Sequence, residues 1–315
     1  MLVSTRDIFS ACYNKYGIAA VNVWAMEQIH GLFSAAQKAG APFIVQTTPV
    51  ARNYAHPHML ISMISAASKI YPDTVFAIHL DHGNKEQALQ SIESGDYNSV
   101  MIDASNESFR ENIAITRKIT EKAHASKITV EAELGVLSGV EDELVHEGKV
   151  EEYTRPEEVE EFVKQTACDS LAVAVGTSHG AYKFSGGKGL QFDILRNIQD
   201  RLPGYPLVLH GGSAVCSEEI QRINASGGRL GIDAKGVSDN ELIKAIEYGV
   251  CKVNIATDAR LIWARVHREF FKYTPAQFDP IVPGISYMEA FEEFILEKFD
   301  LLKSTGKVKH LKNIA

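Results

Sequence analysis

The stretch from Val75 to Gly83, Val-Phe-Ala-Ile-His-Leu-Asp-His-Gly, decides how the rest of the chain is interpreted. It is a nearly continuous apolar run that ends in an acid, a histidine and a glycine, as is typical of a buried strand in a parallel sheet. In barrels of alternating strands and helices, the carboxyl end of a strand carries the chemistry. Because adjacent strand residues point in opposite directions, we expect one of Asp81 and His82 to bind a metal and the other to face a substrate. On this stretch alone, a helix cap followed by a surface histidine is an equal alternative.

Apolar runs rich in β-branched residues recur along the chain, with helical patterns between them. They predict eight strands, at Ile18–Val23, Pro42–Thr47, Val75–Leu80, Ser99–Ile102, Ile128–Leu134, Leu171–Val175, Pro206–Leu209 and Cys251–Ile255. Strands that alternate with helices form a parallel sheet with right-handed crossovers. Eight such units in 315 residues favour a closed (β/α)8 barrel, the TIM-barrel architecture, over an open sheet. We expect a single domain over residues 1–315.

Helix signals lie between these strands. Asn84, Ser217 and Ser238 are predicted N-caps, and Pro156 is predicted in the first turn of a helix. Further helices are predicted at Asp258–Lys272 and, as a C-terminal extension that covers the barrel or pairs with another subunit, at Ser286–Leu302. Two long connections, 135–154 and 176–191, interrupt the alternation, and loops of that length are often functional lids.

Composition restricts the class of protein. The chain is 45% hydrophobic and 23% charged, as is usual for a globular domain, and its net charge of -8 argues against nucleic acid as the main partner. No apolar run reaches the length of a membrane span. The four cysteines lie far apart without a C-x-x-C pair, which indicates neither a thiolate zinc site nor a redox motif and favours a cytosolic, reducing location.

Polar residues follow every predicted strand at the same end. Three of them are histidines, His82, His179 and His210, after the third, sixth and seventh strands. Three imidazoles with an open fourth position make a catalytic zinc site. Each histidine alone is more often structural, but the three together favour the metal site. Asp103 and Glu133 are candidates for supporting carboxylates or for a second cation position.

The other carboxylate of the fifth strand, Glu131, and the remaining histidines carry weaker signals. For Glu131 a solvated strand end is an equal alternative to a functional role. His79 lies inside the third strand and is expected to be a satisfied interior residue. No lysine occupies a predicted strand position suited to a Schiff base.

Glycines at three neighbouring strand ends indicate a phosphate site. The sequences Ser178-His179-Gly180, His210-Gly211-Gly212-Ser213 and Asn254-Ile255-Ala256-Thr257 expose backbone N–H groups. In such barrels a phosphate site often forms after strands seven and eight. Lys183 and Arg260 are candidate positive charges. The alternative is that glycines such as Gly186 to Gly189 only turn the chain.

The motifs resemble those of the class II, zinc-dependent ketose-bisphosphate aldolases. The resemblance rests on Leu80-Asp81-His82-Gly83, Val100-Met101-Ile102-Asp103-Ala104-Ser105, Val130-Glu131-Ala132-Glu133-Leu134-Gly135, Gly176-Thr177-Ser178-His179-Gly180, Leu209-His210-Gly211-Gly212-Ser213 and Lys252-Val253-Asn254. It covers nearly the whole chain, in order. It implies a (β/α)8 barrel, assembled as a homodimer or homotetramer, that splits fructose or tagatose 1,6-bisphosphate in glycolysis or related carbohydrate metabolism.

The resemblance also implies residue roles. His82, His179 and His210 would hold Zn²⁺, Asp103 and Glu133 would belong to an alternative metal position, Asp81 would be the acid/base at the C4 oxygen, and Glu141 would handle the C3 proton. Asn22 matches an active-site amide. The dihydroxyacetone phosphate end would be surrounded by Gly180, Lys183, Gly211, Gly212, Ser213, Asn254, Ile255, Ala256 and Thr257. Thr48 and Arg260 match the site of the other phosphate, and a monovalent cation, Na⁺ or K⁺, is typical nearby.

Two departures from the family pattern leave the sugar open. Ala256 stands where fructose-bisphosphate members often carry Asp, which is closer to the tagatose-bisphosphate pattern, and Thr48 replaces a frequent Ser. Other ketose phosphates are further alternatives, because the chain does not reveal the stereochemistry at C4.

Three rival functions are weighed against the aldolase. Residues 176–180 match G-x-S-x-G, so Ser178 is a candidate nucleophile of a serine hydrolase, although the following segment is predicted as a loop and not as the helix that this motif needs. A metal-dependent barrel hydrolase would show His-x-His on its first strand, whereas His56-x-His58 follows a predicted loop. A non-catalytic aldolase-like subunit would have lost metal ligands, and this chain keeps all three histidines.

Overall fold

A computed structural model describes residues 1–136, 140–141, 144–145, 153–177, 189–231 and 236–312. The described strands are β1 (Ile18–Asn22), β2 (Phe43–Thr47), β3 (Phe76–Gly83), β4 (Ser99–Ile102), β5 (Thr129–Leu134), β6 (Val140–Glu141), β7 (Leu144–Val145), β8 (Ser170–Val173), β9 (Leu207–Leu209) and β10 (Val250–Ile255). Eight of them close into a parallel barrel in the order β1-β10-β9-β8-β5-β4-β3-β2. This confirms the predicted (β/α)8 barrel.

All eight predicted barrel strands are present, and the main difference concerns β3. This strand continues beyond Leu80 through Asp81 and His82 to Gly83. Its pairing with β4 shifts register between Leu80 and Gly83, and His82 has a φ of 48°, in the left-handed region. The regular alternation of side chains is therefore broken at the point where the site residues begin.

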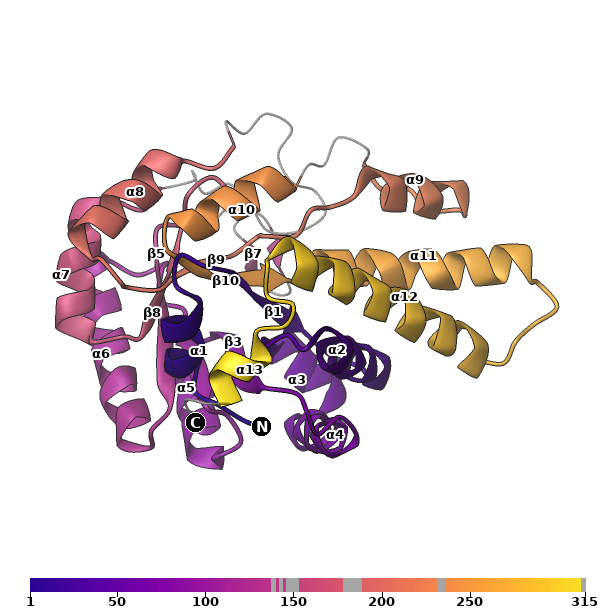
Figure 1. Ribbon diagram of the computed structural model, residues 1–315, viewed down its shortest axis with the longest axis horizontal. Helices are drawn as coiled ribbons and strands as arrows, with labels where there is room; N and C mark the ends of the chain where they lie inside the picture. The colour runs from indigo at the N-terminus through magenta and orange to yellow at the C-terminus, as the bar shows by residue number, and fades with distance from the viewer. Residues whose placement is uncertain (137–139, 142–143, 146–152, 178–188, 232–235, 313–315) are drawn as a thin grey trace.

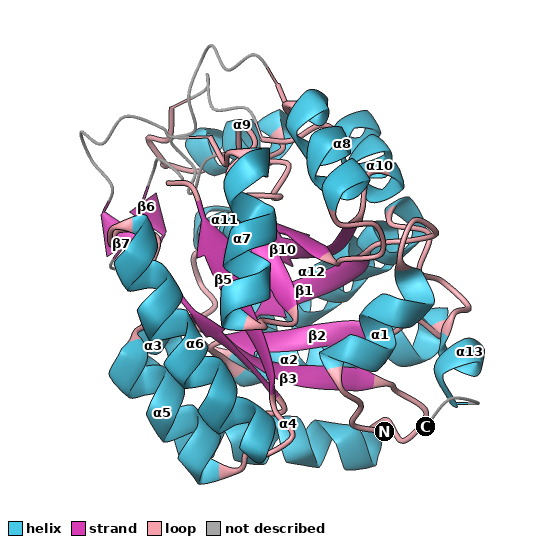
Figure 2. Ribbon diagram, turned by 90° about the vertical axis from the view of Figure 1, so that its left-hand side faces the viewer, coloured by secondary structure: helices cyan, strands magenta, loops and turns pink. Residues whose placement is uncertain are grey.

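The described helices surround the strands, which lie inside (Figure 2). They are α1 (Thr5–Cys12), α2 (Met26–Ala39), α3 (Pro49–Ala55), α4 (Pro57–Ile70), α5 (Lys85–Ser94), α6 (Phe109–Ala125), α7 (Pro156–Thr166), α8 (Phe192–Arg201), α9 (Ser217–Ala225), α10 (Asp239–Glu247), α11 (Thr257–Tyr273), α12 (Ile281–Leu301) and α13 (Val308–Lys312). The apolar faces of the helices and the outward-facing strand residues form one large core cluster.

The predicted helix starts are mostly confirmed. Asn84 and Ser238 cap α5 and α10 with complete capping boxes, and Pro156 begins α7. Ser217 is instead the first residue of α9, after Cys216 at the N-cap. The C-terminal helix, α12, starts at Ile281, five residues before the predicted Ser286, because the apolar residues before Ser286 continue the helical pattern.

Helix α3 occupies the segment before His56 that was predicted as a loop. His56 joins α3 to α4 and His58 lies in the first turn of α4, so neither belongs to a barrel strand. The two-stranded β6–β7 hairpin lies within the predicted long connection after β5. Figure 1 shows α11 and α12 as an antiparallel pair that extends away from the barrel. Within the described part of the chain, no helix has the length and apolar character needed to cross a membrane.

Candidate metal and sugar-phosphate site

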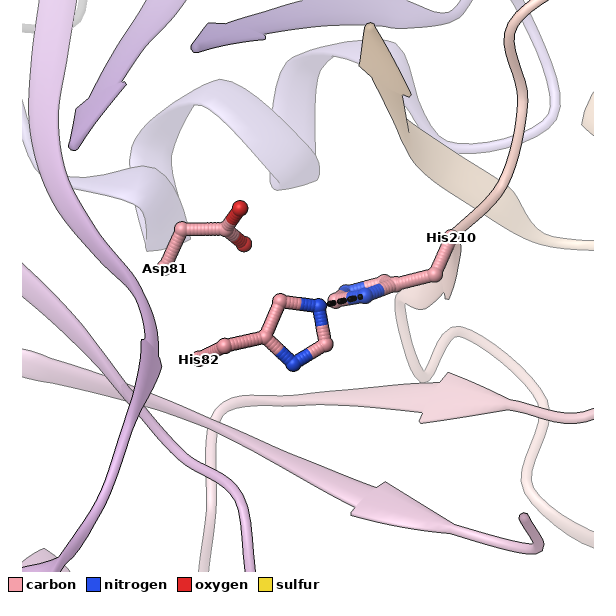
Figure 3. Close-up of side chains that lie close together, drawn as sticks. All are labelled: Asp81, His82 and His210. Atoms are coloured by element: carbon pink, nitrogen blue, oxygen red, sulfur yellow. Dashed lines mark hydrogen bonds between the residues drawn. The ribbon is translucent and has the colours of Figure 1, made fainter. Parts of the chain in front are cut away.

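The centre of the candidate site is a pair of imidazoles that face each other across the barrel. His82 comes from the end of β3 and His210 follows β9, and the Nε2 atom of His82 lies 2.9 Å from the Nδ1 atom of His210 (Figure 3). Both rings are buried. Two nitrogen atoms at this distance need a proton or a cation between them, because both cannot present lone pairs.

The other nitrogen of each ring is oriented by a carboxylate. His82 Nδ1 is 3.0 Å from Asp103 Oδ2, and His210 Nε2 is 2.9 Å from Glu131 Oε1. A carboxylate on one imidazole nitrogen fixes the tautomer and leaves the opposite nitrogen as the metal ligand. The facing nitrogens, His82 Nε2 and His210 Nδ1, are therefore the ones suited to a metal.

Asp81 points into the same space as the two histidines (Figure 3). Ligand atoms of Asp81, His82 and His210 all lie within 4.8 Å of one another. The expectation that Asp81 and His82 diverge is therefore wrong: the left-handed backbone of His82 turns its side chain back toward that of Asp81.

Three side-chain amides hold the carboxylate of Asp81. Asn22 Nδ2 donates to Oδ2 at 2.8 Å, Gln46 Nε2 donates to the same oxygen at 3.3 Å, and Asn254 Nδ2 donates to Oδ1 at 3.2 Å. These residues come from β1, β2 and β10, whereas Asp81 belongs to β3. The carboxylate therefore has a fixed orientation before any substrate arrives.

A second group of potential ligands consists of His82, Asp103 and Glu133, whose ligand atoms also lie within 4.8 Å of one another. Glu133 is buried, and its Oε2 atom has no hydrogen-bond partner among the described residues. Burial and the neighbouring Asp103 carboxylate raise the pKa of Glu133 well above its usual value. Two adjacent buried carboxyl groups with an unsatisfied oxygen fit a cation position, so the residues present are compatible with a bound metal.

The electrostatics of His82 reflect the same surroundings. Burial alone would lower its pKa, but the carboxylates of Asp81 and Asp103 outweigh burial and raise the pKa of His82 well above its usual value. Burial would likewise raise the pKa of Asp103, but the hydrogen bond from His82 lowers it. Acidic groups thus surround the facing imidazoles, which favours a positive charge at this point.

The loops after β9 and β10 lie against each other at the mouth of the barrel. Ser213 Oγ accepts a hydrogen bond from the backbone N–H of Ala256 at 3.4 Å. Gly212 has no room for a side chain, because a Cβ atom would lie 2.6 Å from Val253 Cγ1. Gly211 has a φ of 63°, in the region that favours glycine. These features place the predicted phosphate-binding residues of the two loops together.

The two residues predicted at the other phosphate are also near strand ends. Thr48 follows β2, where its buried hydroxyl caps α3 by accepting from Ala51 N at 3.2 Å. The guanidinium of Arg260, in α11, lies 5.6 Å from the ring centroid of Trp24, which follows β1.

Several predicted residues fall outside the part of the chain that the structure describes. These are His179, Gly180 and Lys183, together with Ser178 of the alternative nucleophile motif. Glu141 lies in β6, and its side chain is likewise outside the described part.

The structure corrects the expectations for the barrel interior. Glu131 is not a solvated strand end: it is buried, and it bonds His210 and Lys252. Lys252 lies in β10 and is fully buried. That no strand lysine is suited to a Schiff base stays a prediction. His79 is confirmed as a satisfied interior residue, with Nδ1 2.8 Å from Ser99 Oγ and Nε2 3.4 Å from Lys252 Nζ. Burial and the Lys252 charge lower the pKa of His79 well below its usual value.

Three residues of the site were assigned no role from the sequence: Gln46, Lys252 and Asp258. The carboxylate of Asp258 accepts from the backbone N–H groups of Ala214 at 3.0 Å and Val215 at 2.9 Å, and so holds the loop after β9. The two-residue period of a strand could have found Lys252, since it is in phase with Asn254 and therefore faces the same side.

Comparison with known proteins identifies the family. Residues 3–307 match the family model described as "Fructose-bisphosphate aldolase class-II". The chain belongs to the class II fructose-bisphosphate aldolase family. Members of this family are lyases that act on a sugar bisphosphate and are generally zinc-dependent.

The relatives match along most of their length. A fructose-bisphosphate aldolase of Treponema pallidum (strain Nichols) is 41% identical over 299 residues, which cover 89% of each chain. A fructose-bisphosphate aldolase of Thermus caldophilus is 37% identical over 309 residues, 98% of this chain and 100% of the relative. Among solved structures, the YdjI aldolase of Escherichia coli K12 has a TM-score of 0.77 at 29% identity and covers 98% of this chain and 100% of that one.

Family membership argues against two of the rival functions. The G-x-S-x-G match at 176–180 lies within the residues that match the aldolase family model, so a serine hydrolase is not needed to explain it. A metal-dependent barrel hydrolase is not supported either, because β1 carries no His-x-His sequence.

Proposed function

We propose that the chain catalyses the reversible, metal-dependent cleavage of fructose 1,6-bisphosphate to dihydroxyacetone phosphate and glyceraldehyde 3-phosphate, as a single barrel domain over residues 1–315. The observation that carries this proposal is the buried convergence of His82, His210 and Asp81 on one space at the carboxyl end of the barrel. Two oriented imidazoles can hold a metal there, and an adjacent, separately oriented carboxylate can exchange protons with a substrate bound beside it.

The proposed metal is Zn²⁺, held by His82 and His210 and by His179, which lies outside the described residues. When bound, zinc supplies a Lewis acid that polarises the ketone of the sugar and stabilises the negative charge that forms beside it. Asp103 and Glu133, with His82, are proposed as an alternative position for the ion. A chain that keeps these ligands is better suited to catalysis than to the role of a non-catalytic subunit.

Asp81 is the proposed acid/base at the C4 oxygen. In the cleavage direction its carboxylate takes the proton of the C4 hydroxyl as the C3–C4 bond breaks, and it returns that proton in the condensation direction. The amides of Asn22, Gln46 and Asn254 keep the accepting oxygens aimed into the site. Glu141 is proposed to move the proton at C3.

Both phosphates of the substrate are proposed to bind at strand ends. The dihydroxyacetone phosphate end is assigned to Gly180, Lys183, Gly211, Gly212, Ser213 and the segment from Asn254 through Ile255 and Ala256 to Thr257. Thr48 and Arg260 are assigned to the other phosphate, and a Na⁺ or K⁺ ion is proposed near the first. Two anchored ends hold the scissile bond over the acid/base and metal residues.

A tagatose 1,6-bisphosphate aldolase is the second candidate, because Ala256 stands where the fructose enzymes often have Asp. A coupled assay of cleavage rates with fructose 1,6-bisphosphate, tagatose 1,6-bisphosphate and other ketose phosphates, each with and without chelator, distinguishes the two. The proposal expects the largest kcat/KM for the fructose compound and its loss with chelator. A larger kcat/KM for the tagatose compound would favour the second candidate, and no cleavage of any ketose phosphate would overturn both.

We also propose that the chain forms a homodimer or homotetramer. The end of the α11–α12 pair exposes large apolar side chains, namely those of Phe271, Tyr273, Phe278, Ile281, Val282 and Ile285. Exposed apolar clusters of this kind often mark subunit contacts. Light scattering on the purified protein tests this proposal, and a monomer at micromolar concentration would contradict it. The cytosolic location stays a prediction of the sequence.

A further inference from the structure

A buried lysine beneath the candidate metal site has no role in the chemistry proposed above. Lys252, in β10, is 0% exposed, and its ammonium lies 2.8 Å from Glu131 Oε2 and 3.0 Å from Glu131 Oε1. Glu131, in β5, is 1% exposed. Strands β9 and β8 separate β10 from β5 in the barrel order, so this ion pair crosses the barrel interior.

The ion pair is connected to the metal site through one atom. Glu131 Oε1 lies 2.9 Å from His210 Nε2, on the side of the ring opposite to the nitrogen that faces His82. The orientation of the His210 ring therefore depends on where the Glu131 carboxylate is held. Lys252 bonds both oxygens of that carboxylate and fixes its position.

The negative charge of the buried Glu131 carboxylate also indicates that Lys252 holds it in place. A carboxylate buried without a counter-charge is strongly destabilising, so Glu131 needs a nearby cation if it is to remain anionic beneath His210. Lys252 supplies that cation, and the described residues that it contacts, Glu131 and His79, lie below the facing imidazoles. The ammonium reaches the metal site through the Glu131 carboxylate, which bonds His210 in turn.

We propose that Lys252 is a positioning residue: through Glu131 it fixes the ring orientation and tautomer of His210, so that the Nδ1 atom of His210 is available to the metal. The inference rests on the proposed function, since it takes His210 to be a metal ligand. It gives Lys252 no covalent role. A lysine in a barrel strand of an aldolase invites a Schiff-base interpretation, but this ammonium is held by both oxygens of a buried carboxylate.

The test measures zinc affinity by competition with a chromophoric chelator, and not only turnover. Lys252→Met keeps the length of the side chain and removes the charge. We expect its zinc affinity to fall by about 10–100-fold, as is usual when a partner that orients a metal ligand is lost. Ser99→Ala is the matched control, because it removes a buried hydrogen bond to His79 on the side of the network away from Glu131, and its zinc affinity should stay close to that of the wild type.

A pair of double variants keeps the test valid if Lys252→Met does not fold. Lys252→Met with Glu131→Gln is electrically neutral and keeps an oxygen that accepts from His210 Nε2, whereas Lys252→Met with Glu131→Leu has no acceptor. We expect the first to bind zinc at least tenfold more tightly than the second. Equal affinities in the two double variants would overturn the proposal, as would wild-type zinc affinity in a folded Lys252→Met.

Two further results separate this inference from the proposed function. If the wild-type protein binds no zinc, the proposed function fails. If the wild-type protein binds zinc and the folded Lys252→Met variant binds it with equal affinity, only the positioning role is overturned. Borohydride reduction in the presence of the sugar substrate tests the Schiff base: a substrate-derived adduct on Lys252 would overturn the positioning role, and the account expects none.

Discussion

The two ends of the barrel interior differ in chemistry although the same strands build both. The amino end is filled by apolar side chains from α1, α13 and the strand starts, such as those of Ile8, Phe9, Ile18 and Val308. At the carboxyl end the same barrel buries polar and charged groups, including those of Asp81, Glu133 and His210. Apolar burial stabilises a fold strongly, whereas buried ion pairs contribute little net stability. The amino end therefore maintains the barrel, and the carboxyl end is specialised for chemistry.

The largest effect is expected from removing a metal ligand at the carboxyl end. His210→Ala should lose its bound zinc, and with it nearly all turnover, because only two of the three proposed imidazole ligands, those of His82 and His179, would remain to hold the ion. Elemental analysis of the purified variant measures the metal content. A variant that retained one zinc per chain would show that the imidazole pair is not the metal site.

The next largest effect is expected at Asp81. Asp81→Ala should keep zinc and lose cleavage by about two to four orders of magnitude, since it removes the proposed acid/base and leaves the proposed metal ligands in place. Steady-state assays with zinc content confirmed by elemental analysis measure this loss. Normal turnover in the zinc-loaded variant would remove Asp81 from the proposed mechanism.

The smallest effect on turnover is expected at the amino end. Ile8→Ala removes a fully buried side chain from the apolar cluster and should lower the free energy of unfolding by about 2–5 kcal/mol with kcat nearly unchanged. Denaturant unfolding and the standard assay measure the two quantities, and Ile8→Val is the milder control, expected at about 0.5–1.5 kcal/mol. A large fall in kcat with unchanged stability would contradict the division between the two ends.

Sequence reasoning was most reliable where the physical signal is local. Apolar runs placed all eight barrel strands, and side-chain caps such as Asn84 and Ser238 placed helix starts, because both depend on neighbouring residues. The bounds of α3 and α4 were not predicted, although Thr48 caps α3 and Pro57 begins α4. The start of α12 was predicted too late, because no side-chain cap marks it.

Long-range features of the site were harder to predict. The convergence of Asp81 with His82 depends on a left-handed residue and a register shift, which no periodicity reveals. Glu131 and Lys252 appear in the sequence as isolated charges, and their pairing exists only because the barrel brings β5 and β10 to face each other. The predicted metal ligands His82 and His210 do come together, because parallel strands present their carboxyl ends at one edge.

The most direct test of the account is a zinc titration of the metal-free protein, with cleavage of fructose 1,6-bisphosphate and bound zinc measured on the same samples. We predict no cleavage without metal, and a rate that rises in proportion to bound zinc and reaches its maximum at one ion per chain. Full cleavage by the metal-free protein would contradict it.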